Sequence, residues 1–105
     1  MRKLVAGNWK MNGSLAQLAE LDRVAAAASA NRQVDAAVCP PFTLIVPARE
    51  RAPGLMIGAQ DVHSKECGAH TGCVSVPMLK EAGAPLAIVW HSERRTRQGA
   101  GGSEV

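Results

Sequence analysis

Polar side chains that suit the binding and polarisation of an anionic substrate follow short apolar runs along this chain. Asn8 and Lys10 come directly after the first run, Gln60 after the third and His91 after the fourth. Where helices connect parallel strands, the residues beyond the carboxyl ends of those strands converge on one face. We therefore expect an ammonium, an amide and an imidazole to gather there, which suits an anionic substrate with a carbonyl group.

The elements that must position these side chains follow from the hydrophobic pattern. Four apolar runs of mostly small or β-branched residues predict strands, and segments with helical spacing separate them. This alternation is typical of an α/β protein with a parallel sheet. The predicted strands are Leu4–Ala6, Val34–Cys39, Met56–Ala59 and Leu86–Val89.

Two helices are expected in the first half of the chain. Ser14 and Gln17 form a Ser-x-x-Gln capping box, which predicts a helix from this point to about Ser29. After the second strand, the pair Pro40–Pro41 blocks further strand and leads into a second helix. Pro47 is expected in its first turn, where a missing N–H costs little.

The third connection begins with a long segment, residues 61–75, that has no apolar period. A loop of this length is often functional. Ser75 is predicted to cap a short helix over Met78–Ala82, which Gly83 closes in a left-handed conformation. The glycine-rich end of the chain, residues 98–105, is predicted to be a flexible tail.

Composition limits the classes of protein to consider. A chain of 105 residues with 47% hydrophobic content fits one domain, residues 1–105. Its net charge of +3 is too small to indicate nucleic-acid binding, but it favours a small anionic substrate. The N-terminal segment lacks the apolar core of a signal peptide, and the odd set of Cys39, Cys67 and Cys73 favours reduced thiols, so we expect a cytoplasmic protein.

Two motifs resemble the triosephosphate isomerase family. The segment Gly7–Asn12 is similar to the end of the family's first strand, and His91–Arg95 to the end of its fourth. Residues 59–62 and 68–72 resemble its third strand and its interface loop, so the resemblance covers nearly the whole chain up to Arg97. It implies a partial TIM (β/α)8 barrel, in which three helices connect four parallel strands.

The resemblance also implies an activity and roles for particular residues. In this family dihydroxyacetone phosphate and glyceraldehyde 3-phosphate interconvert through an enediolate, with a glutamate shuttling the proton and with no cofactor or metal. Asn8 and Lys10 would bind the substrate, and Lys10 would offset the charge of the phosphate and the enediolate. His91 would be the electrophile, a neutral imidazole beside a helix N-terminus. Ser92 and Glu93 would support it.

A homodimer is a further implication of the resemblance. In family members the interface loop inserts into a neighbouring subunit and brings the equivalent of Thr71 near the active site. The chain departs from the family pattern in this loop, because His70 and Cys73 stand where phenylalanine and glutamate are usual. Trp90 replaces the glycine that normally precedes the electrophilic histidine, and its indole would crowd or reorient His91.

The length of the chain sets an expectation about its completeness. A TIM barrel typically has about 250 residues, so the chain is expected to be an N-terminal fragment. The glutamate base, the flexible lid and the later phosphate-binding loops belong to strands six to eight of the family. We therefore expect Lys10 and His91 to bind and polarise a triose phosphate without completing its isomerisation.

Other interpretations are open at this stage. His63, Cys67, His70 and Cys73 offer four nitrogen and sulfur ligands within one loop, a set that zinc accepts, although paired C-x2-C spacing is missing. A half-barrel with open strand edges would alternatively be non-catalytic and would self-associate or dock onto a complementary fragment. The basic run Arg94–Arg97 lacks interleaved aromatic residues and is not expected to bind nucleic acid.

Overall fold

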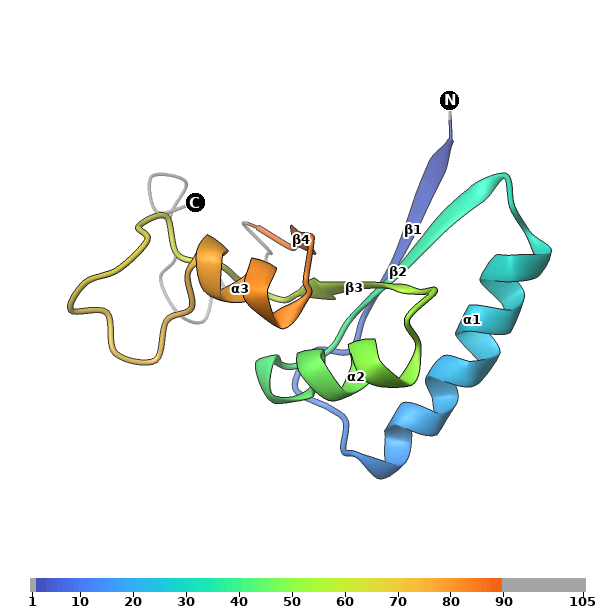
Figure 1. Ribbon diagram of the computed structural model, residues 1–105, viewed down its shortest axis with the longest axis horizontal. Coiled ribbons are helices and arrows are strands. Elements are labelled where there is room, and N and C mark those ends of the chain that lie inside the picture. The colour runs from blue at the N-terminus through green and yellow to red at the C-terminus, as the bar shows by residue number, and fades with distance from the viewer. Residues whose placement is uncertain (1, 90–105) are drawn as a thin grey trace.

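The computed structural model describes residues 2–89, in which strands alternate with helices (Figure 1). In chain order the elements are strand β1 (Lys3–Asn8), 3-10 helix η1 (Ala16–Ala19), helix α1 (Glu20–Ala30), strand β2 (Val34–Cys39), 3-10 helix η2 (Phe42–Leu44), helix α2 (Ile45–Arg51), strand β3 (Met56–Ala59), helix α3 (Val76–Ala82) and strand β4 (Leu86–Ala87). The predicted order of elements is confirmed. β2 and β3 have the predicted bounds, β1 is longer than predicted, and β4 is shorter by two residues.

The four strands pair in the order β1-β2-β3-β4, and all neighbours are parallel. β1 and β2 pair along their whole length, from Lys3 opposite Val34 to Asn8 opposite Cys39. β2 and β3 share only two paired positions, which begin at Ala37 and Met56. The curled sheet, with helices in the connections between its strands, has the architecture of a partial TIM barrel (Figure 1).

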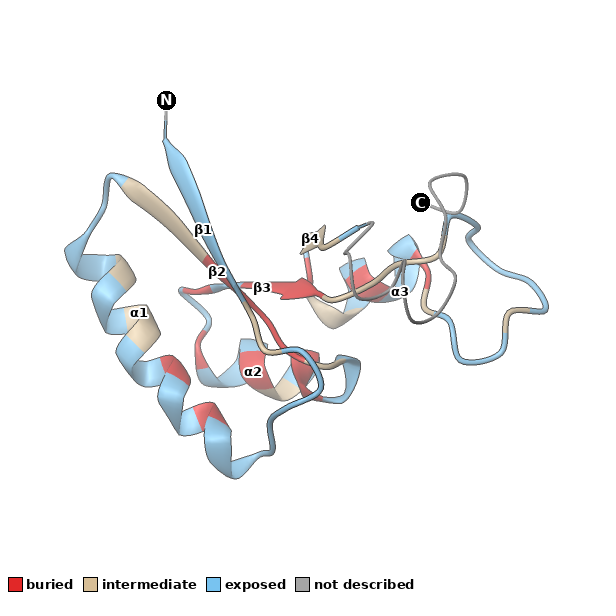
Figure 2. Ribbon diagram, turned by 180° about the vertical axis from the view of Figure 1, so that it is seen from behind, coloured by how far each residue is buried: buried red, intermediate tan, exposed pale blue. Residues whose placement is uncertain are grey.

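The hydrophobic core lies between the sheet and helices α1 and α2. Leu21 of α1 and Ile45 of α2 are fully buried, and they belong to one cluster with Val38 of β2 and Ile57 of β3. Figure 2 shows the buried residues gathered on β2, β3 and the facing sides of the helices. Burying one such aliphatic side chain contributes about 1.5–3 kcal/mol, so this layer supplies most of the favourable burial.

β4 pairs directly with β3, and Gly58 lies opposite Leu86 in this pairing. A Cβ atom at Gly58 would approach the Cys39 sulfur to 2.7 Å and would overlap the side chain of Leu86. Glycine at this position therefore leaves room for the Leu86 side chain against β3. β1 is covered less, because Leu4 and Val5 point to opposite faces of the strand and are 56% and 60% exposed.

The first helix begins later than the sequence predicts. The Oγ atom of Ser14 accepts a hydrogen bond from the backbone N–H of Gln17 at 3.4 Å, and the Ser14 carbonyl accepts from the same group at 3.1 Å. The shorter bond closes a 3-10 turn, which continues into η1. The α-helical part then runs from Glu20 to Ala30 without a side-chain cap. The predicted helix exists and the Ser14 side chain makes its predicted bond to Gln17, but η1 lies between this bond and the start of α1.

The later helices follow the prediction closely. Pro47 is the third residue of α2, within its first turn. Ser75 caps α3 by accepting a hydrogen bond from the backbone N–H of Met78 at 3.4 Å, and Gly83 follows the helix with a φ of 97°. Residues 61–75 contain no helix or strand. Among residues 2–89, every helix is too short or too polar to cross a lipid bilayer.

Candidate active site

Asn8 and Lys10 occupy the carboxyl end of β1, as predicted. Asn8 is the last residue of the strand, and its Oδ1 atom accepts a hydrogen bond from the backbone N–H of Lys10 at 2.8 Å. Lys10 has a φ of 57° and is the one residue other than glycine with a positive φ among residues 2–89. A non-glycine residue in this conformation costs about 1–3 kcal/mol, and such strain is concentrated at functional sites.

Gln60 holds the Lys10 backbone from a distant part of the chain. Its Nε2 atom donates a hydrogen bond to the carbonyl oxygen of Lys10 at 2.8 Å and another to the carbonyl oxygen of Cys39 at 2.9 Å. Cys39 ends β2 and Gln60 directly follows β3, so one amide connects the ends of three strands. The sequence indicated that Gln60 lies at this edge, but not that it bonds to the backbone.

The turn after Lys10 is packed against the body of the sheet. Trp9 donates its backbone N–H to the Cys39 carbonyl at 3.1 Å, and the side-chain amide of Asn12 donates to the Trp9 carbonyl at 3.0 Å. A Cβ atom at Gly13 would lie 2.9 Å from both Leu44 and the Trp9 ring, and Gly13 has a φ of 122°. A side chain at position 13 would therefore be strained, and glycine keeps this turn compact.

The arrangement places a lysine at the carboxyl edge of a parallel sheet. Lys10 is exposed and Asn8 is partly buried. An ammonium has three donors and binds phosphate or a developing oxyanion as a point charge. Because hydrogen bonds fix its backbone on both sides, this lysine is placed for anion binding before any ligand arrives.

The remaining predicted site residues are divided between the loop and the end of the chain. His91, Ser92 and Glu93 lie outside the described residues, as does Trp90. Thr71 is exposed in the segment between β3 and α3, which projects away from the sheet (Figure 1). The structure therefore brings together Asn8, Lys10 and Gln60, and it places Thr71 apart from them.

The loop after β3 is ordered by contacts between its own residues. His63 donates its backbone N–H to the Val74 carbonyl at 2.8 Å, and its Nδ1 atom accepts from the Lys65 N–H at 2.9 Å. The rings of His63 and His70 stack with centroids 4.0 Å apart. Within the described part of the chain no three histidine, cysteine or acidic side chains are grouped closely enough to hold a metal ion, so the zinc interpretation gains no support.

Cys39 lies beneath the site and is a structural residue. Its side chain is fully buried, and this burial raises the pKa of its thiol above the ordinary value. A raised pKa disfavours the thiolate, which is the reactive form of cysteine. The contribution of Cys39 to the site is its backbone carbonyl, which accepts from Gln60 and from Trp9.

Comparison with known proteins agrees with this geometry. The family model for triosephosphate isomerase matches residues 3–104. The chain belongs to the triosephosphate isomerase family. The predicted resemblance is thereby confirmed, and it favours an isomerase origin over a non-catalytic half-barrel.

Individual relatives show how much of the family fold the chain spans. It is 51% identical over 104 residues to triosephosphate isomerase of Ruegeria sp. (strain TM1040), covering 99% of this chain and 42% of the relative. It is 52% identical over 100 residues to that of Brucella abortus, covering 91% and 39%. The crystal structure of triosephosphate isomerase from Bartonella henselae superimposes with a TM-score of 0.84 at 42% identity, over 94% of this chain and 42% of that one. The chain thus spans about two fifths of the length of these relatives, and the predicted partial barrel is confirmed.

Proposed function

We propose that this chain carries the lysine and histidine side of a triosephosphate isomerase active site. The reaction is the interconversion of dihydroxyacetone phosphate and glyceraldehyde 3-phosphate through an enediolate. The observation that supports this role is the fixed, strained backbone of Lys10 at the carboxyl end of β1. Strain maintained by several hydrogen bonds is expected where side-chain position matters for binding or catalysis.

In the proposed mechanism a charged residue, Lys10, binds the anionic groups, and a neutral one, His91, polarises the carbonyl group. Lys10 binds the phosphate group and offsets negative charge as it develops on the enediolate oxygens. Asn8 orients the Lys10 turn through its side-chain oxygen and lies beside the substrate. His91 donates a hydrogen bond to the carbonyl oxygen, supported by Ser92 and Glu93. Preorganised donors of this kind stabilise the transition state because they need no reorganisation during the reaction.

The proton-shuttling glutamate belongs to the later strands of the family barrel. The proposal therefore assigns substrate binding and carbonyl polarisation to this 105-residue chain, and no turnover when it acts alone. The relatives are more than twice as long, and we infer that the base comes from the part of the barrel that this chain does not span. A homodimer formed through the loop that carries Thr71, and a cytoplasmic location that suits three free cysteines, complete the proposal.

Binding and turnover test the proposal separately. Dihydroxyacetone phosphate is titrated into the purified chain while the methyl signal of Met11, next to Lys10, is followed by NMR. Lys10→Met should weaken binding about tenfold or more, the loss expected for one hydrogen bond to a charged group. Lys3→Met, the matched removal of an exposed lysine at the other end of β1, should leave binding unchanged. Equal affinity of the chain and Lys10→Met for this substrate would contradict the assignment.

A coupled isomerase assay of the chain alone tests whether it turns over substrate without the glutamate base. No turnover above the uncatalysed rate is expected. Turnover that disappears on His91→Gln would show that these 105 residues supply their own base, and would overturn that part of the proposal.

A further inference from the structure

Two hollows flank the amino end of β3, at the edge of the sheet opposite Lys10. The first has a volume of about 560 Å³ and lies between the end of α1 and the start of β2. The second, of about 440 Å³, lies between α2 and α3. Met56, the first residue of β3, lines both. Each volume lies within the range of roughly 300–1,000 Å³ that is typical of small-molecule sites.

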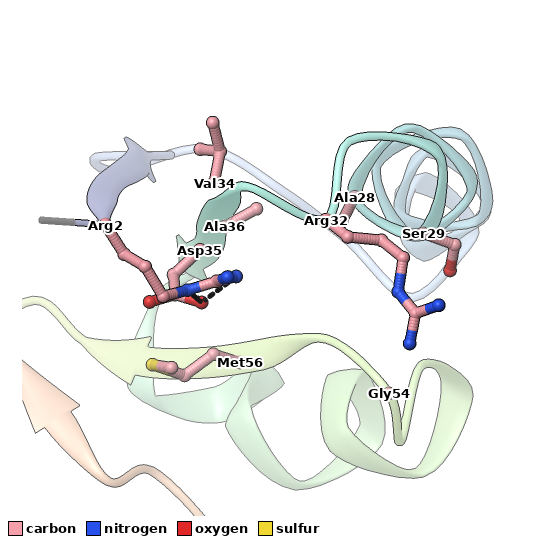
Figure 3. Close-up of a pocket in the computed structure, with 9 residues that line it drawn as sticks. All are labelled: Arg2, Ala28, Ser29, Arg32, Val34, Asp35, Ala36, Gly54 and Met56. Atoms are coloured by element: carbon pink, nitrogen blue, oxygen red, sulfur yellow. Dashed lines mark hydrogen bonds and ion pairs between the residues drawn. The ribbon is translucent and has the colours of Figure 1, made fainter.

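The first hollow exists because β2 and β3 separate at this edge. They pair only from Ala37 and Met56 onward, so the amino half of β2 has no neighbour on that side within residues 2–89. Figure 3 shows Arg2 and Asp35 joined on one side of the hollow and the guanidinium of Arg32 on the other. The Arg2 bonds to Asp35 Oδ1 measure 3.1 Å from Nε and 2.9 Å from Nη2.

The second hollow adds two further cations. Arg49 and Lys80 line it together with apolar side chains. Arg49 packs over Gly83, where any side chain would overlap its guanidinium, so its position depends on that glycine. Within the described residues, no carboxylate forms an ion pair with Arg32, Arg49 or Lys80.

The charge balance of the two hollows is strongly one-sided. Four cationic side chains line them, and Asp35 is the one carboxylate that does so among residues 2–89. The surplus of three positive charges equals the formal net charge of the whole chain, which is +3. Positive charge gathered around concave, partly apolar walls raises the local concentration of anions.

We propose that the amino edge of the sheet binds phosphate or carboxylate groups in these two hollows beside Met56, with Arg32 and Arg2 as donors in the first and Arg49 and Lys80 in the second. Arg32 and Arg49 present planar donor groups that can bind either kind of anion in a bidentate manner. Arg2 keeps one face toward Asp35, which fixes its guanidinium at the rim. This site is distinct from the Lys10 edge and does not depend on the isomerase proposal.

The four methionines provide reporters of where an anion binds. The chain, with ¹³C-labelled methionine methyl groups, is titrated with inorganic phosphate and separately with succinate, at constant ionic strength maintained with chloride. The methyl signal of Met56 is expected to shift and saturate. A shift of Met11 instead would report binding beside Lys10, so the two sites are read in the same spectrum.

Matched arginine variants test whether Arg32 contributes to the anion binding that Met56 reports. Arg32→Gln should weaken the Met56 titration about tenfold, and Arg32→Lys, which keeps the charge, should recover part of the loss. Arg23→Gln removes the same charge from an exposed position of α1 outside both hollows and should leave the titration unchanged. Saturation with phosphate alone, succinate alone or both supports the site and identifies its anion. Failure of Met56 to saturate with either anion, or equal weakening by Arg32→Gln and Arg23→Gln, overturns it.

Discussion

The side-chain amide of Gln60 donates a hydrogen bond to the backbone carbonyl of Lys10 at 2.8 Å, across 50 residues of sequence. The same Nε2 atom bonds to the Cys39 carbonyl at 2.9 Å. Lys10 has a positive φ of 57°, which the chain would avoid without these contacts. Gln60 therefore stabilises both the junction of three strand ends and the strained backbone of Lys10.

Removing the amide should destabilise the protein measurably. Gln60→Ala deletes both hydrogen bonds and leaves the partly buried Cys39 carbonyl with one donor fewer, so we expect a loss of about 1–3 kcal/mol in the free energy of unfolding. Urea unfolding monitored by circular dichroism would give this value from the shift in midpoint. Gln33→Ala, at an exposed position before β2, should change stability by less than about 0.5 kcal/mol. Equal shifts for the two variants would contradict the role of Gln60.

Relieving the strain at Lys10 should have the opposite effect on stability. Glycine adopts a φ of 57° without steric cost, so Lys10→Gly should be more stable than Lys10→Ala by about 1 kcal/mol. Both variants lack the ammonium and should lose affinity for dihydroxyacetone phosphate equally. Urea midpoints and the Met11 titration measure the two effects. A glycine variant less stable than the alanine variant would show that Lys10 is not strained in solution.

Much of the fold could be predicted because short segments of the sequence carry the signals for individual strands and helix ends. The β-branched and small residues of Val34–Cys39 and Met56–Ala59 marked strands at their true bounds, and Ser75 and Gly83 marked both ends of α3. The start of the first helix was harder to predict. The Ser14 side chain makes the bond to Gln17 that the capping pattern predicts, but the same N–H also closes a 3-10 turn that leads into η1, and sequence spacing alone does not predict this turn.

The candidate site was predictable in its location and less so in its contacts. Strand order and the family resemblance placed Asn8 and Lys10 at one edge. The positive φ of Lys10 carries no signal in its own residue type, because lysine is not favoured there. The bond from Gln60 depends on the register of three strands, which tertiary packing decides. The first hollow beside Met56 likewise arises because β2 and β3 pair only from Ala37 and Met56 onward, and no local pattern encodes that point.

Two exposed ion pairs should make stability depend on pH in the acidic range. A hydrogen bond from Arg2 lowers the pKa of Asp35 below its ordinary value of 3.8, and one from Arg51 does the same for Asp22. Because the folded-state pKa is the lower one, the stabilisation is fully present above the ordinary value and is lost as the pH falls through the folded-state pKa. The effect should be small, since the Asp35 and Asp22 side chains are 44% and 59% exposed.

The acid dependence can be assigned with single substitutions. Urea midpoints between pH 7 and pH 2.5 should show that the advantage of the unmodified chain over Asp35→Asn or Asp22→Asn shrinks at the acidic end. High salt should reduce the same advantage at neutral pH. Glu50→Gln, at an exposed position without an ion pair among the described residues, serves as the charge control. An advantage that is constant over the whole pH range would show that the pairs do not form in solution.

The three cysteines should divide into two reactivity classes. Cys67 and Cys73 are exposed, whereas Cys39 is fully buried and its thiol has a pKa raised by burial. Since the thiolate is the nucleophile, an aromatic disulfide reagent should titrate two thiols rapidly in the folded chain and the third only as urea unfolds it. Cys39→Ala should abolish the slow phase, and the double variant Cys67→Ser with Cys73→Ser should abolish the fast one.

The rate of the slow phase then reports opening of the sheet beneath Lys10, because the Cys39 carbonyl accepts the Gln60 bond. Gln60→Ala should accelerate it, whereas three thiols reacting in a single phase would contradict the burial of this strand end.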